Sequence, residues 1–136
     1  MDSIYTLDQT DEIAAQLVQQ YASKPVWVFQ APMGAGKTTL IAAIGKAMGI
    51  QEAMSSPTFS IMNEYEVQGK LIYHMDWYRL ENAAEARQAG VEAAMEEADL
   101  SLVEWPEKAP NLVPEHAVVF NIEFIDPDQR RIYTNQ

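Results

Sequence analysis

A glycine-containing turn between a strand and a helix constrains this chain more than any other stretch. Residues 26–29, VWVF, form a short apolar run that predicts a buried β-strand. The turn APMGAG follows at once and leads into a helix that we expect to begin near Lys37. The letters GAGKTT match the phosphate-binding P-loop pattern in all but its first position. Strand, turn and helix in this order indicate a phosphate site at the edge of an α/β sheet.

The residue types in this turn suit an oligophosphate for physical reasons. Glycines let the backbone curl so that successive N–H groups point inward, and the helix adds its unsatisfied amides and the positive end of its dipole. Lys37 would place an ammonium against the outer phosphates, and the Thr38 hydroxyl would coordinate a magnesium ion. The alternative is a glycine-containing turn that binds nothing, but Lys37 and Thr38 at these positions favour a nucleotide.

Ala31 departs from the pattern because it stands where the first glycine is expected. Alanine resists a positive φ, so a loop that needed one here would be strained. Pro32 favours extended backbone at the residue before it, and alanine adopts that conformation easily. We therefore expect the loop to form, and the substitution raises the question of nucleotide affinity.

Length and composition bound the class of protein. We expect one domain over residues 1–136, because 48% hydrophobic and 10% aromatic residues are typical of a globular chain of this length. No apolar run approaches the ~20 residues needed to span a bilayer, and the acidic, polar N-terminus does not resemble a secretory or transit signal. The chain has no cysteine and so no disulfide frame. These features favour a cytoplasmic protein without a membrane anchor.

The charge balance bears on partners. Twenty Asp and Glu residues against nine Lys and Arg residues give a formal net charge of −11. Such a surface repels polyanions, so we expect any connection to a nucleic acid to run through a partner. The alternative is that the acidity only favours solubility.

Apolar spacing and turn residues predict the remaining elements. We expect a helix with Thr10 as its N-cap and a buried face through Tyr21, and a second helix that ends at Gly49. A hairpin of residues 59–66 and 71–78, closed at 67–70, precedes two short helices within 81–98, a strand at 99–104 and two strands at 117–125 and 130–134. The predicted fold is α/β: a P-loop NTPase-like, mostly parallel sheet flanked by helices, with an added antiparallel hairpin.

Two carboxylates, Asp76 and Glu104, stand at the ends of apolar strands, where α/β sheets place their sites. Phosphate cleavage needs a metal and a group that positions the attacking water. Either carboxylate could hold magnesium while the other orients the water, and the sequence leaves these roles open. Each could also be an ordinary surface or capping carboxylate.

Three other residues have two interpretations each. Thr58 follows the P-loop helix, where its hydroxyl could reach the γ-phosphate side, but it could equally be a turn threonine beside Pro57. His74 is more typical of a packed or hydrogen-bonded histidine than of a catalyst. Trp105 could stack near a nucleotide or fill the core, and its residue type alone favours the core.

Four motifs resemble the TsaE (YjeE) family in order and spacing. They are GAGKTT, SPTFSIMNEY at 56–65, HMDWYRL at 74–80 and EWPE at 104–107. The resemblance covers residues from about 8 to 125, and its departures from the family pattern are Ala31 and Trp77. Members of this family are small bacterial P-loop ATPases required for making threonylcarbamoyladenosine in tRNA, next to the anticodon.

The resemblance implies an ATPase with a low basal rate that binds ATP or ADP with Mg²⁺ and acts on a complex of its partners TsaB and TsaD. ATP turnover is expected to reset those partners between rounds, and tRNA is reached only through the complex. The implied catalytic residues are Lys37, Asp76 and Glu104, and the implied metal ligands are Thr38, Asp76 and Glu104. The implied nucleotide contacts are Met33, Gly34, Ala35, Gly36, Lys37, Thr38, Thr39, Thr58 in a switch-like loop, and Trp105.

Two rival functions stay open. A small-molecule kinase usually brings several arginines to two sets of phosphates, and this chain has only Arg79, Arg87, Arg130 and Arg131. A GTPase is disfavoured because no NKxD-type segment occurs. The rival from a different class is a regulatory module that binds ATP and turns it over negligibly.

Overall fold

The structure is a computed structural model, and it describes residues 1–52, 54, 55, 57 and 61–134. Its strands are β1 (Asp2–Thr6), β2 (Val26–Gln30), β3 (Met62–Val67), β4 (Lys70–Asp76), β5 (Leu100–Glu104), β6 (Val118–Asp126) and β7 (Gln129–Tyr133). Its helices are α1 (Thr10–Gln20), α2 (Lys37–Met48), α3 (Ala83–Gln88) and α4 (Val91–Glu97), with single 3₁₀ turns η1 (Leu7–Gln9), η2 (Pro106–Lys108) and η3 (Pro110–Leu112).

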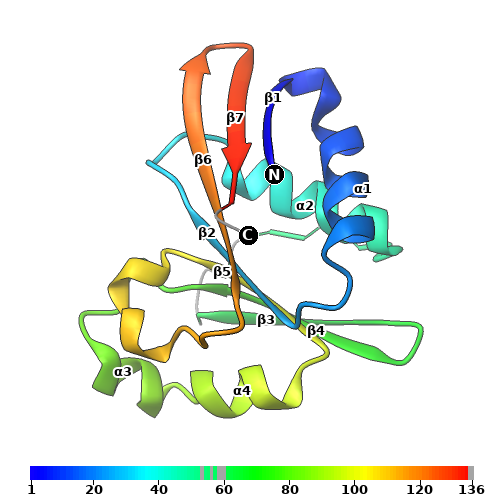
Figure 1. Cartoon of the computed structure of the whole chain (residues 1–136). Coiled ribbons are helices and arrows are strands. Elements are labelled where there is room, and N and C mark those ends of the chain that lie inside the picture. The colour runs from blue at the N-terminus through cyan, green and yellow to red at the C-terminus, as the bar shows by residue number, and fades with distance from the viewer. Residues whose placement is uncertain (53, 56, 58–60, 135–136) are drawn as a thin grey trace.

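One seven-stranded sheet joins these strands in the order β1-β7-β6-β2-β5-β4-β3. Strands β6, β2, β5 and β4 pair in parallel, whereas β3 pairs with β4, β7 with β6 and β1 with β7 in antiparallel fashion. The predicted α/β sheet is therefore confirmed in its parallel centre and in the antiparallel hairpin at one edge, while β7 and β1 add two further antiparallel pairings at the other edge. Its central strand β2 leads into α2, so the phosphate loop lies at the middle of the sheet edge (Figure 1).

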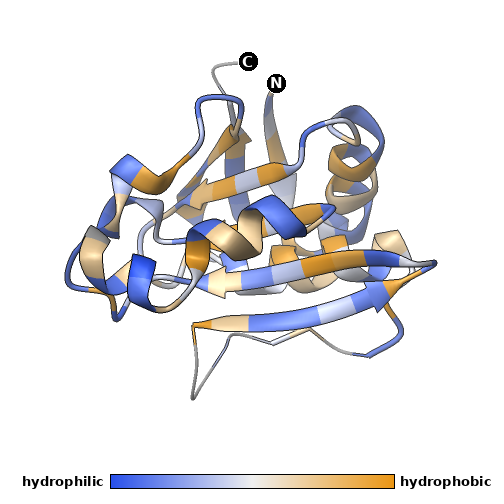
Figure 2. Ribbon diagram, turned by 90° about the horizontal axis from the view of Figure 1, so that it is seen from below, coloured by the Kyte–Doolittle hydropathy of each residue, from blue (hydrophilic) through white to orange (hydrophobic). Residues whose placement is uncertain are grey.

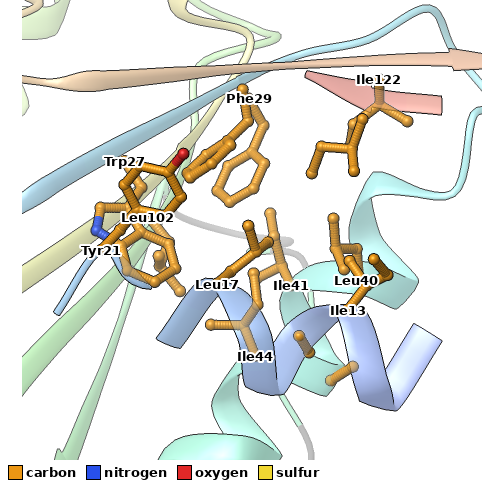
Figure 3. Packing of buried hydrophobic residues seen from close by; sticks show 14 of the residues in the cluster. Ile13, Leu17, Tyr21, Trp27, Phe29, Leu40, Ile41, Ile44, Leu102 and Ile122 are labelled. Atoms are coloured by element: carbon orange, nitrogen blue, oxygen red, sulfur yellow. The ribbon is translucent and has the colours of Figure 1, made fainter. Parts of the chain in front are cut away.

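Alternation along β2 divides the core into two clusters. Trp27 and Phe29 pack with α1 and α2 on one side of the sheet. Val26 and Val28 pack with α3, α4 and the 3₁₀ turns on the other side. A strand buried on both sides is typical of parallel sheets, because helices cover each face. Figure 3 shows the first cluster, with Leu17 of α1 and Ile41 of α2 directed toward the sheet.

The helices are amphipathic because only one side of each lies against the sheet. Ile13, Ala14 and Leu17 are the buried apolar positions of α1, at helical spacing. The ribbons of Figure 2 accordingly alternate between hydrophobic and hydrophilic bands along the helices. The two short helices expected within 81–98 are present, and Gly49 ends α2 as predicted, with φ of 96°. Within the described part of the chain, no helix combines the length and hydrophobicity that a membrane span requires.

Two details of the predicted elements are wrong. Thr10 is the first residue of α1 and not its N-cap, because η1 runs directly into the helix and moves its start toward Thr6. The Thr6 N–H donates to Gln9 Oε1 at 2.9 Å, while the Thr10 hydroxyl donates to the Leu7 carbonyl at 2.6 Å. Strand β1 was not expected at all. The predicted start of the hairpin at residue 59 lies outside the described residues.

Candidate functional site

The loop between β2 and α2 has the backbone of a phosphate cradle. Gly34 and Gly36 have φ of 83° and 86°, a conformation that glycine adopts without the strain of a side chain. Among the described residues, positive φ at a residue other than glycine occurs only at Gln68 and Trp105. Ala31 is therefore not in the left-handed region, and the expectation that the loop forms with alanine here is confirmed. The Leu40 N–H donates to the Gly36 carbonyl at 3.0 Å, which ties the loop to the first turn of α2.

Lys37, the first residue of α2, is buried with its charge. Lys37 is only 7% exposed, and its Nζ has no hydrogen-bond partner within the described part of the chain. The ammonium lies 3.5 Å from the centroid of the Trp105 ring. Burial lowers the pKa of Lys37, and the carboxylates of Glu104, Glu107 and Asp76 act in the opposite direction. A buried ammonium without hydrogen bonds is rare in proteins, which marks this position as one that suits an anion.

Glu104 ends β5 directly beside that lysine. Its residue is 1% exposed, and its partners in the sheet are Phe29 of β2 and Asp76 of β4. The Thr38 hydroxyl donates to Oε1 at 3.3 Å, and His74 Nε2 lies 2.7 Å from Oε2. The two carboxylate oxygens therefore face different neighbours, one on α2 and one on β4. The hydrogen bond to a carboxylate indicates that Nε2 carries a proton.

Asp76 ends β4 at the same sheet edge. It is half-buried, and its Oδ1 accepts a hydrogen bond from the Tyr78 N–H at 3.0 Å. The register places Asp76 opposite Glu104, so the two carboxylates predicted to share an edge do share it. This edge is formed by the carboxyl ends of β2, β4 and β5, the usual position of a binding site in an α/β sheet.

Trp105 covers Lys37 and also packs against the second core cluster. The interpretation as a core residue therefore holds in part, and a contact with a nucleotide stays a prediction. Its ring contacts that of Tyr78, with centroids 4.9 Å apart and planes inclined by 53°. Beyond Tyr78, Lys108 Nζ lies 5.4 Å from the tyrosine ring centroid. Two lysines thus flank this pair of aromatic rings.

Two other predicted contacts, Met33 and Thr39, lie on the loop and on α2. Met33 is 68% exposed at the tip of the loop, and Thr39 lines a hollow of about 630 Å³ between η1, α1 and α2. Thr58 lies outside the described residues. No group of three or more His, Cys, Asp and Glu side chains able to hold a metal occurs among the residues that the structure describes. A metal held here would therefore need oxygen atoms of a substrate to complete its coordination.

Two residues lie at the site although the sequence did not predict them there. His74 contacts Glu104, and Arg130 of β7 donates from Nε to the Ala35 carbonyl at 3.0 Å. His74 and Asp76 share a face of β4 because they are two residues apart, but that spacing alone does not bring His74 to Glu104. The contact of Arg130 had no local signal, because the two residues are 95 positions apart.

A sheet with a parallel centre, whose central strand runs through this loop into a helix and whose neighbouring strands end in carboxylates, defines a P-loop NTPase-like α/β protein. The family model described as "Threonylcarbamoyl adenosine biosynthesis protein TsaE" matches residues 4–132. The chain belongs to the TsaE family. The resemblance and the fold class predicted from the sequence are both confirmed.

Individual relatives agree with this assignment. The chain is 34% identical over 122 residues to the tRNA threonylcarbamoyladenosine biosynthesis protein TsaE of Haemophilus influenzae, covering 89% of this chain and 77% of that protein. Identity to the protein of the same name from Synechocystis is 40% over 111 residues, covering 78% and 69%. The crystal structure of Bacillus subtilis YdiB superposes with a TM-score of 0.76 at 25% identity, covering 98% of this chain and 83% of that one.

Proposed function

We propose that this protein binds ATP with Mg²⁺ and hydrolyses it as a subunit of the machinery that makes threonylcarbamoyladenosine in tRNA, next to the anticodon. It acts with TsaB and TsaD, which carry out the transfer. Membership of the TsaE family supports the pathway. The observation that carries the ATP-binding part is the buried ammonium of Lys37, which lacks a hydrogen-bond partner among the described residues and stands at the start of the helix that follows the cradle.

The loop fits a chain of phosphates. The N–H groups at the start of α2 have no partners within the helix, and its dipole favours negative charge there. Phosphate oxygens would supply the hydrogen bonds that Lys37 Nζ lacks and would offset the desolvation of its charge. In this proposal residues from Met33 to Thr39 surround the phosphates, Thr58 senses the γ-phosphate and Trp105 borders the nucleotide.

The donor set also fits magnesium. Hydroxyl and carboxylate oxygens are the ligands that Mg²⁺ prefers, and it is usually held by one or two carboxylates together with substrate phosphates. Thr38 and Glu104, which already contact each other, would hold the ion, and Asp76 lies opposite Glu104 at the same sheet edge. The ion would neutralise charge on the phosphates. Because Glu104 is adjacent to Thr38, we assign it to the metal side, and we assign Asp76 to the orientation of the attacking water.

The kinase alternative is weaker still in the light of the arginine contacts. Arg87 pairs with Glu92, and Arg131 pairs with Asp2 and Glu123, all at the surface. Arg79 donates to the Pro57 carbonyl and Arg130 to the Ala35 carbonyl. Side chains with these partners do not form the arginine clamp that two phosphorylated substrates require.

The contact of Trp105 with Lys37 favours slow turnover by the isolated protein. The ring occupies one side of the ammonium that the phosphates would also approach. A regulatory module that binds ATP and hydrolyses it negligibly therefore remains the second candidate. A measurement of turnover separates the two.

The experiment is Mg²⁺-dependent ATP hydrolysis by the full chain, alone and with the TsaB–TsaD pair from the same organism. We expect a low basal rate that the pair stimulates. Asp76→Ala and Glu104→Gln should keep ATP binding and lose hydrolysis, and Glu104→Gln is the gentler change because an amide can still contact Thr38 and His74. Glu96→Gln, at an exposed position in α4, is the matched control.

Three results would be decisive. Stimulation by the pair supports the partner-coupled ATPase. Binding without hydrolysis in either condition selects the regulatory module. Failure of the wild-type chain to bind ATP, measured by calorimetric titration, refutes both.

A further inference from the structure

Arg130 of the C-terminal strand β7 is buried against the phosphate loop. The residue is 7% exposed, and its Nε donates to the Ala35 carbonyl at 3.0 Å. Its Nη1 donates to the carbonyls of Asp126 and Gln129 at 2.7 and 2.9 Å. The guanidinium carbon lies 4.6 Å from the centroid of the Phe124 ring. Arg130 therefore has most of its hydrogen bonds directed to backbone atoms, and one of them reaches across to the loop.

The bond to Ala35 has a consequence for the next amide. A trans peptide unit is planar, and its C=O and N–H point in opposite directions. Since the Ala35 carbonyl points at Arg130, the N–H of Gly36 in the same peptide unit points away from Arg130. With Gly36 at φ of 86°, this N–H belongs to the curled stretch that precedes Lys37. Arg130 thus fixes the direction of one backbone donor of the cradle.

The fit of Arg130 to the loop is close. A Cβ placed on Gly36 would lie 3.7 Å from Nε of Arg130, which is ordinary van der Waals contact. Lysine could not reproduce the arrangement, because arginine presents several donors in a rigid planar fork and lysine a single flexible ammonium. Arg131, the next residue, differs: it is half-buried and forms surface ion pairs with Asp2 and Glu123 at 2.7 and 2.9 Å.

We propose that Arg130 is a positioning residue of the phosphate loop: it holds the Ala35–Gly36 peptide so that the Gly36 N–H faces the phosphates of a bound nucleotide. This role rests on the proposed function only for the identity of the ligand. The proposal makes the hairpin of β6 and β7 part of the nucleotide site, because Arg130 lies on β7. The carbonyls that also hold its guanidinium belong to Asp126 and Gln129, the strand ends on either side of the hairpin turn.

The test compares Arg130→Ala and Arg130→Lys with Arg131→Ala in the full chain. The first readout is the affinity for Mg²⁺–ADP, measured by isothermal titration calorimetry. If the Gly36 N–H no longer faces the phosphates, the complex loses one hydrogen bond to a charged acceptor, which corresponds to about tenfold weaker binding or more. We expect such a loss for Arg130→Ala, a smaller but clear loss for Arg130→Lys, and a change of less than about twofold for Arg131→Ala, whose exposed pairs contribute little.

The second readout is the Gly36 amide itself in the absence of nucleotide. In ¹H–¹⁵N NMR spectra the Arg130 variants should shift this resonance and speed its hydrogen exchange, while amides of the central strand β2 keep their protection. A general loss of structure would affect both, so the pattern separates positioning from stability.

Two outcomes overturn the proposal. One is ADP affinity in a folded Arg130→Ala chain equal to that of Arg131→Ala. The other is an Arg130→Lys chain whose Gly36 resonance and hydrogen exchange are unchanged and whose ADP affinity equals that of the wild type. This second outcome applies even if Arg130→Ala does not fold. If the wild-type chain binds no ADP, the proposed function fails, and the Gly36 amide still tests the clamp alone.

Discussion

Replacement of Lys37 by methionine should stabilise the nucleotide-free protein slightly and weaken ATP binding strongly. Methionine keeps the buried aliphatic stem and removes the ammonium, which has no hydrogen-bond partner within the described residues. An unsatisfied buried polar group costs roughly 1–3 kcal/mol. The contact with the Trp105 ring at 3.5 Å returns up to about 2 kcal/mol. Because the penalty is larger for a charged group, its upper end applies, and the difference predicts a free energy of unfolding that is higher by about 1 kcal/mol.

The same substitution should lower the affinity for ATP, although it raises the stability of the nucleotide-free protein. Charge-assisted hydrogen bonds to the phosphates contribute about 1.5–3 kcal/mol, so Lys37→Met should weaken binding by roughly 10- to 100-fold. Ligand-induced stabilisation amplifies this difference. At ATP a thousandfold above the wild-type Kd the stabilisation is about 4 kcal/mol, and for a variant that binds 100-fold more weakly it falls to about 1.4 kcal/mol.

Urea unfolding with and without Mg²⁺–ATP measures both quantities on the same samples. Lys46→Met is the matched control: Lys46 lies on the same helix, is exposed, and pairs with Asp11 at 3.4 Å across the surface. It should leave ATP binding unchanged and stability within about 0.5 kcal/mol. The reasoning would be refuted by a Lys37→Met chain that loses more than about 2 kcal/mol of stability, or that binds ATP as tightly as the wild type.

Two further predictions concern stability away from the site. Gly45→Ala should destabilise by about 1 kcal/mol in urea unfolding, because overpacking costs about 1–3 kcal/mol and helix propensity returns about 1; the new Cβ would lie 2.1 Å from Met54 Sδ. In a Met54→Ala background the same change should stabilise, and a stabilising effect in the wild type would contradict the overlap. The hydrogen bond from Arg131 lowers the pKa of Asp2 below its usual 3.8. The folded carboxylate therefore contributes stability above about pH 3.8 that disappears as the pH falls through its lowered pKa, so the gap between wild type and Asp2→Asn should shrink in acid, and an unchanged gap between pH 7 and pH 3 would disprove this.

The central elements of the fold were predictable because their signals are local. Strand β2 is a continuous apolar run, and glycine marks the loop before α2 and the end of that helix. Strand β1 has no such signal. Only Tyr5 of its five residues is buried, and Ile4 is 60% exposed. Its extended conformation depends on pairing with β7 at the far end of the chain, so no pattern within DSIYT indicated it.

The same distinction applies to the candidate site. Lys37 and Thr38 belong to one motif, and Asp76 and Glu104 could be placed at one edge because parallel strands end together. The contact between His74 and Glu104 required the register of β4 on β5, which the chain order does not fix. The roles of these residues toward ATP and magnesium stay predictions that the measurements above test.

The backbone conformation of Trp105 explains how Glu104 and Trp105, although consecutive, both contact α2. In an extended strand successive side chains point to opposite faces. At the end of β5, however, Glu104 contacts Thr38 and Trp105 contacts Lys37. Trp105 has φ of 58°, a left-handed conformation that costs a residue other than glycine roughly 1–2 kcal/mol. The packing of the ring on Tyr78 and its contact with the Lys37 ammonium offset that cost, so the same two contacts hold the turn after β5 and place the ring beside the lysine of the phosphate loop.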